Sequence, residues 1–77
     1  LSEEERKSIF NSLEEALYTA TDTGSIRVTK AVLKLVSAGK FDISHETLMY
    51  HARGAYRKGH EDVTRALVEA ADSMSSS

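Results

Sequence analysis

Residues 44–59 read SHETLMYHARGAYRKG, and this stretch contains the start, the periodicity and the end of a helix. Ser44 can accept the free backbone amides at a helix start, and Gly59 can take the left-handed conformation that ends one. Between them apolar residues recur at helical spacing, so we expect a helix over residues 45–58. Its predicted inner face consists of Leu48, Met49, Ala52, Ala55 and Tyr56.

Two helices are expected before this stretch. Ser2, followed three positions later by Glu5, has the pattern of a capping box and predicts a helix over residues 3–21. Ser25 can cap a second helix over residues 26–38. The predicted buried positions are Ile9, Leu13, Ala16, Leu17 and Ala20 in the first helix, and Val28, Ala31, Val32, Leu35 and Val36 in the second.

Residues 40–43 form a short extended link in which Phe41 and Ile43 point the same way, so both are expected to cover the core as a lid. A fourth helix is expected over residues 60–73, and the serine-rich residues 73–77 are expected to form a frayed tail. The predicted buried positions of the fourth helix are Val63, Ala66, Leu67, Ala70 and Met74.

These elements predict an all-α fold, a small bundle of about four amphipathic helices with a short extended link between the second and the third. The 77 residues allow one domain with a small core, which we place at residues 1–72. The chain has no proline and no cysteine, and the lack of cysteine fits a reducing, intracellular setting. The longest apolar stretches are a few residues long, so no membrane span is predicted.

The charges are segregated along the chain. Residues 1–15 have a net charge of −3, residues 16–59 of +4 and residues 60–77 of −3, which together give −2. The basic middle can steer an acidic partner, while the acidic ends discourage general adhesion to nucleic acid.

No pattern predicts catalysis, a metal site or a cofactor. His45, His51 and His60 are not spaced to lie on one helix turn, and no HExxH or acidic-loop pattern accompanies them. The four glycines are isolated, so there is no glycine-rich phosphate loop. We therefore predict a non-enzymatic protein.

The outer face of the helix over residues 45–58 is the best candidate for a binding surface. Tyr50, Arg53, Gly54 and Arg57 fall on one stripe, and Lys58 adjoins it. Tyrosine and arginine often anchor protein interfaces. Gly54 costs about 1 kcal/mol in a helix relative to alanine, which suggests close approach by another backbone. An ordinary solvated face is the alternative.

The second helix carries a similar stripe of Arg27, Lys30 and Lys34. If the second and third helices lie side by side, the two stripes merge into one basic surface. Taken alone, the stripe of the second helix is explained by solvation.

Residues 39–58 resemble the C-terminal nucleocapsid-binding domain of rhabdovirus phosphoproteins. Members of that family have a glycine turn, a short extended stretch of the Ile-Ser type, and an apolar helix with a tyrosine and basic residues. The corresponding residues here are Gly39 with Lys40, Ile43 with Ser44, Leu48 with Met49 and Tyr50, and Arg53 followed by Arg57 and Lys58. The chain departs from the pattern in its first 20 residues, where some members begin with a strand.

The resemblance implies an adaptor that docks on the RNA-bound nucleoprotein and tethers the viral RNA polymerase to its template in the host cytoplasm. It implies no direct contact with nucleic acid, and polymerase contact through other parts of the protein. The partner-binding residues would be Tyr50, Arg53, Arg57 and Lys58, and the stripe of the second helix would add Lys30 and Lys34.

Two other interpretations use the same residues. Residues 15–24 and 47–63 both look like ankyrin helix pairs that repeat at 35 residues, although the usual Thr-Pro opening is missing. Alternatively, residues 45–57 are the recognition helix of a helix-turn-helix DNA-binding domain. The acidic ends weaken this last interpretation, because phosphate contacts dominate DNA affinity.

Overall fold

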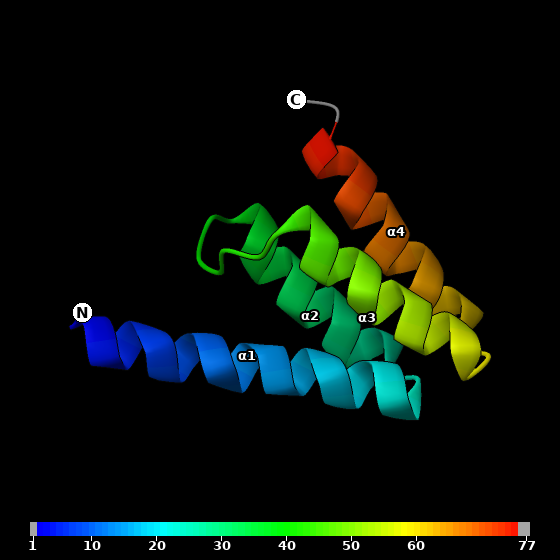
Figure 1. Cartoon of the computed structure of the whole chain (residues 1–77), viewed down its shortest axis with the longest axis horizontal. Helices are drawn as coiled ribbons and strands as arrows, with labels where there is room; N and C mark the ends of the chain where they lie inside the picture. Colours follow the sequence, from blue (N-terminus) through cyan, green and yellow to red (C-terminus); the bar gives the residue numbers. More distant parts are fainter. Residues whose placement is uncertain (1, 76–77) are drawn as a thin grey trace.

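The computed structural model describes residues 2–75, which form four helices joined by short connections (Figure 1). The helices are α1 (Glu3–Thr23), α2 (Ile26–Ser37), α3 (His45–Arg57) and α4 (Glu61–Ser75). Within this described part of the chain there is no strand. The predicted all-α fold is confirmed, and every predicted helix boundary lies within two residues of the observed one.

Serine caps fix the starts of three helices. The amide of Glu5 donates to Ser2 Oγ at 3.2 Å, and the amide of Ser2 donates to Glu5 Oε1 at 3.2 Å, which completes the predicted capping box. Hydrogen bonds from the Ser2 backbone and then its side chain lower the pKa of Glu5. Ser25 and Ser44 accept the amides three residues on, at 3.3 and 3.1 Å. These bonds satisfy amides that a helix start leaves unpaired.

The chain forms two helical hairpins, α1–α2 and α3–α4, that pack on each other (Figure 1). α2 lies against α1 and α4, and α3 lies against the same two helices. No Cα atom of α2 lies within 8 Å of one in α3. α2 and α3 therefore lie at opposite corners of the bundle, and their outward faces point away from each other.

The hairpins repeat one turn at a spacing of 35 residues. Gly24 and Gly59 follow α1 and α3 with φ angles of 78° and 80°. The residue after each glycine donates its amide to the carbonyl of Ala20 or Ala55, in both cases at 3.0 Å. This arrangement satisfies carbonyls at the helix end and reverses the chain into the next helix.

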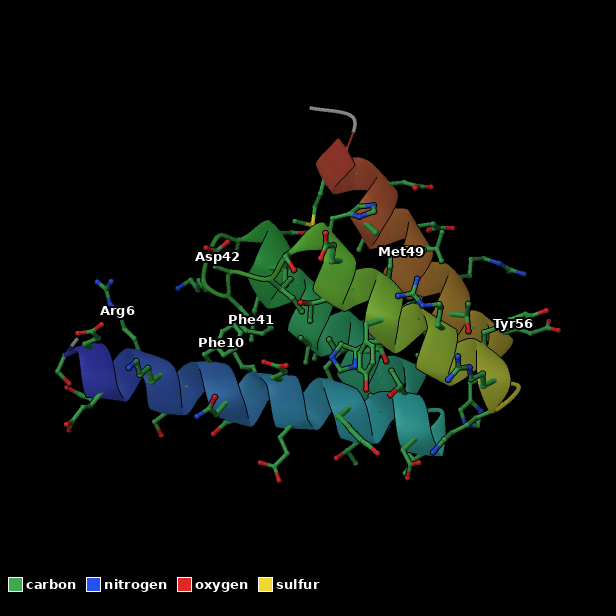
Figure 2. All side chains as sticks on the ribbon, viewed as in Figure 1. Arg6, Phe10, Phe41, Asp42, Met49 and Tyr56 are labelled. Atoms are coloured by element: carbon green, nitrogen blue, oxygen red, sulfur yellow. The ribbon has the colours of Figure 1, made fainter. Side chains whose placement is uncertain are left out.

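The core fills the space between the hairpins, and its largest fully buried side chains are Leu17, Leu48, Leu67, Val63 and Thr29. Phe41 and Ile43 in the link are each 4% exposed, so the predicted lid is confirmed. The ring of Phe41 packs against that of Phe10 with centroids 5.2 Å apart. Figure 2 shows this pair between α1 and the link.

Two predicted burial patterns are wrong in the first hairpin, one in each helix. Ile9 is 45% exposed because α1, at 21 residues, extends past the 12-residue α2 and leaves its first turns uncovered. Val28 and Ala31 are also exposed. Thr29 takes the buried position instead, and its hydroxyl donates to the Ser25 carbonyl at 2.9 Å, so no polar group is left unpaired there.

The second hairpin differs from the prediction at its inner face and its end. Tyr56 is 72% exposed, and His51 occupies the buried position one turn from Leu48. Figure 2 shows Tyr56 pointing outward near the start of α4. Met74 is 38% exposed. α4 continues to Ser75 through the start of the predicted tail, and residues 76 and 77 lie outside the described part of the chain.

A contact between the two turns joins the hairpins. The Nε2 of His60 donates to the carbonyl oxygen of Asp22 at 3.2 Å, and the Lys58 ammonium forms an ion pair with the Asp22 carboxylate. The His60 imidazole covers Gly24 so closely that a Cβ on this glycine would lie 2.6 Å from its Nδ1. Position 24 therefore requires glycine for both its backbone angle and its lack of a side chain.

This contact predicts different effects for the two turn glycines. Gly59→Ala should destabilise the fold by about 1–2 kcal/mol, because the left-handed conformation is strained in a residue with a Cβ. Gly24→Ala should cost at least about 1 kcal/mol more, because its methyl group also overlaps His60. Urea denaturation followed by helical circular dichroism measures both losses. Equal losses in the two variants would contradict the turn-to-turn contact.

Candidate functional site

The outer face of α3 carries the residues that the sequence analysis selects for partner binding. Tyr50 is 67% exposed, and Arg53 and Arg57 are exposed on the same stripe. The opposite side of the helix, with Leu48 and Ala55 at 0% exposure, faces the core. α3 thus brings together one large aromatic ring and two guanidinium groups.

The structure separates Lys30 and Lys34 from this group but leaves Lys58 beside it. Lys58 lies next to Arg57 but is ion-paired with Asp22, which offsets its charge. Lys30 and Lys34 are exposed on α2, whose outward face points away from that of α3. The condition for one merged basic surface, that α2 and α3 lie side by side, is not met.

The seam between α1 and α3 is hollowed in three places, and Tyr50 borders all three. One of them, which we call the His51 pocket, has a volume of about 160 Å³. Its walls include Tyr18 of α1, which is 55% exposed, and five residues of α3. These five are Tyr50, His51, Arg53, Gly54 and Arg57.

His51 is the unusual residue of this pocket. It is 5% exposed, and its buried Nε2 has no hydrogen-bond partner among the described residues. The rings of His51 and Tyr50 meet in a T-shaped arrangement, with centroids 5.4 Å apart. Burial lowers the pKa of His51 while Glu14 acts to raise it, so the imidazole is mainly neutral at pH 7. An unpaired buried polar atom of this kind costs about 1–3 kcal/mol of stability.

Gly54 is a second weak point beside His51. It lies inside α3, where glycine costs about 1 kcal/mol relative to alanine. A Cβ built on Gly54 would meet nothing within 4 Å, so no packing contact within the chain excludes a side chain there. Gly54 lines the His51 pocket together with Arg53 and Arg57, and we call the open space at its missing side chain the notch.

The charges along the seam differ in sign between the two ends of α3. Arg53 and Arg57 have no ion-pair partner in the described residues and lie toward the C-terminal end of α3. Glu14 and Glu46 border the depression toward the N-terminal end of α3. Two like charges one turn apart are slightly destabilising on a helix, and an external anion would remove that repulsion.

Another groove, of about 810 Å³, lies between the first half of α1 and the link. Phe10 and Phe41 form part of it, and Arg6 and Asp42 border it with opposite charges (Figure 2). These mixed charges favour no particular class of ligand.

No group of three or more His, Asp or Glu side chains suited to hold a metal ion occurs in residues 2–75. Over the same residues, no helix has both the length and the apolar character needed to cross a bilayer.

The sequence patterns did not indicate two residues of the His51 pocket, Tyr18 and His51. Tyr18 and Arg53 are 35 residues apart and so occupy equivalent positions in the two hairpins. Extending the α3 stripe to the first hairpin by this spacing would have found Tyr18. No pattern indicates that the Nε2 of His51 is unpaired, because that depends on how α1 packs over it.

The fold and the site together define a small all-helical domain with an aromatic and basic seam. Comparison of the chain with models of protein families, with curated proteins and with solved structures found no match.

His51 predicts a pH dependence of stability. Its pKa is lower in the folded chain than the ordinary 6.5, so the unfolded chain binds the proton first. The free energy of unfolding should fall as the pH drops below about 6.5 and level off below the folded pKa, with a slope of at most about 1.4 kcal/mol per pH unit. His51→Leu should flatten this slope between pH 7.5 and 5.5 in urea denaturation.

His45→Leu is the matched control, because His45 is exposed at the start of α3. It should retain the wild-type slope. A His51→Leu slope equal to that of the wild type would show that the burial of His51 is not the cause.

Proposed function

We propose that this chain is a non-enzymatic protein-interaction domain that docks its partner along the seam between α1 and α3. The observation that carries the proposal is the cluster of exposed Tyr18 and Tyr50 with the unpaired Arg53 and Arg57 around one pocket. Tyrosine and arginine supply large contact areas and directed hydrogen bonds, and they dominate the binding energy of many interfaces. Their concentration in one hollow favours a docking role over simple solvation.

The first partner to test is the RNA-bound nucleoprotein of a rhabdovirus. Residues 39–58 resemble the nucleocapsid-binding domain of the viral phosphoproteins, and Tyr50, Arg53 and Arg57 of that segment border the His51 pocket. In this role the domain tethers the polymerase, bound by other parts of the protein, to its template in the host cytoplasm.

The helix arrangement argues against the helix-turn-helix alternative. Such a domain packs its recognition helix against the helix before it in the chain. Here α3 is preceded by α2, from which its Cα atoms stay more than 8 Å away, and it packs chiefly against α4. The repeated hairpin instead favours, as a second candidate, a helical-repeat interaction module of the ankyrin type, which also binds proteins.

Charge reversal tests the docking surface. Arg53→Glu combined with Arg57→Glu should weaken binding to purified nucleoprotein–RNA complexes at least about tenfold, because removing a charged interface contact costs about 2 kcal/mol or more. Fluorescence anisotropy of the labelled chain measures the affinity, and circular dichroism verifies that helical content is unchanged.

Lys30→Glu combined with Lys34→Glu is the matched control, because it changes the net charge equally on the outward face of α2. This variant should bind like the wild type. Equal weakening by both pairs would show a general charge effect and sink the assignment. Binding of the wild type to naked duplex DNA at physiological salt, falling steeply as salt rises, would favour the DNA-binding alternative.

A further inference from the structure

Two structural weaknesses of α3 meet at the same pocket. One is the buried Nε2 of His51, which has no partner within the described chain, and the other is Gly54, which no packing contact requires. Each position would be more stable with an ordinary residue, an apolar side chain at 51 and alanine at 54. Natural sequences keep such local weaknesses mainly where function requires them.

The His51 pocket has an excess of positive charge that suits a small anion, because Arg53, Arg57 and Lys58 line it with a single carboxylate, that of Asp22, which pairs with Lys58. Arg53 and Arg57 line the pocket together with Gly54 and supply guanidinium donors. His51 also lines the pocket, and its Nε2–H, which is closed to solvent in the structure, becomes a further donor once the ring turns toward the ligand. The volume of about 160 Å³ leaves room for one carboxylate and the carbon that bears it.

The seam also indicates how the rest of the ligand lies. Tyr18 and Tyr50 border the pocket from the two helices and offer ring surface to a flanking chain. Beyond Tyr50 the next hollow is lined by Glu14 and Glu46 as well as Arg53, and its two carboxylates repel a second acidic group. The charges therefore favour an acidic group at the arginine end and not along the whole seam.

We propose that the His51 pocket receives the carboxylate of an aspartate or glutamate side chain from a partner protein, held by Arg53, Arg57 and the Nε2–H of His51 over the notch left by Gly54. This inference rests on the proposed docking function in taking its ligand from a protein. It specifies the chemical group that the partner contributes, a carboxylate, and the two residues that make room for it, His51 and Gly54.

The test uses the whole chain and a defined probe. An acetylated and amidated decapeptide of alternating glycine and glutamate is titrated into the isotope-labelled protein, and the same peptide with glutamine in place of glutamate is the control. Nuclear magnetic resonance follows the imidazole of His51 and the amide of Gly54. Saturable shifts of both signals by the glutamate peptide, at least about tenfold weaker with the glutamine peptide, are expected.

Substitutions separate this site from general charge attraction. Gly54→Ala should raise the melting temperature by about 4–8 °C, because alanine is the better helix former. It should nevertheless weaken binding of the glutamate peptide at least about fivefold, because its methyl group occupies the notch. His51→Leu should also stabilise the fold and weaken binding of the glutamate peptide. Lys30→Glu combined with Lys34→Glu should leave the shifts at His51 and Gly54 unchanged.

The proposal would be overturned if Gly54→Ala bound the glutamate peptide as tightly as the wild type does. It would also be overturned if the peptide shifted only the resonances of the α2 stripe, Arg27, Lys30 and Lys34. Gly54→Ala carries the test alone if His51→Leu loses helical content, since its methyl group enters open space. Inorganic phosphate that binds the pocket more tightly than the glutamate peptide, at equal ionic strength, would also overturn the assignment to a carboxylate. Peptide binding without nucleoprotein binding would leave the pocket standing and reject only the proposed partner.

Discussion

The fold depends on the burial of a small apolar core between two helical hairpins. The chain has 77 residues and no cysteine, so no disulfide supports it, and its largest fully buried side chains are three leucines, one valine and one threonine. A core of this size leaves little stability in reserve. The hairpins are joined further by the contact of Asp22 with His60 and Lys58, which brings one turn against the other. This contact holds α1 in place beside α3, and so it maintains the seam.

The seam illustrates the difference between stability and recognition. α3 buries Leu48, Ala52 and Ala55 on one side, as an ordinary amphipathic helix does. Near its outer side it keeps an unpaired histidine nitrogen and an interior glycine, both of which weaken the fold. Because the core is small, these weaknesses consume a large part of the available stability. Their position beside Arg53 and Arg57, which form no ion pair with the described residues, is the reason for proposing that a ligand binds there.

Local signals were reliable wherever one short segment decided the structure. Ser2, Ser25 and Ser44 accept amides within three residues of themselves, so the helix starts were predictable from sequence alone. Burial was less predictable because it depends on neighbours. Val28 is 40% exposed, whereas Val63, its equivalent 35 residues later, is fully buried. The difference arises because the two hairpins have different neighbours in the fold.

The sequence by itself determined four helices, their boundaries, the lid of Phe41 and Ile43, and the exposed stripe of Tyr50, Arg53 and Arg57, because caps and periodicity act within a few residues. Only the tertiary structure decided that Lys30 and Lys34 lie away from that stripe, that Lys58 pairs with Asp22, and that Tyr18 joins Tyr50 across the seam. It also decided that His51 is buried with an unpaired nitrogen. These features depend on how the two hairpins pack, which brings together or keeps apart segments that are distant in the sequence.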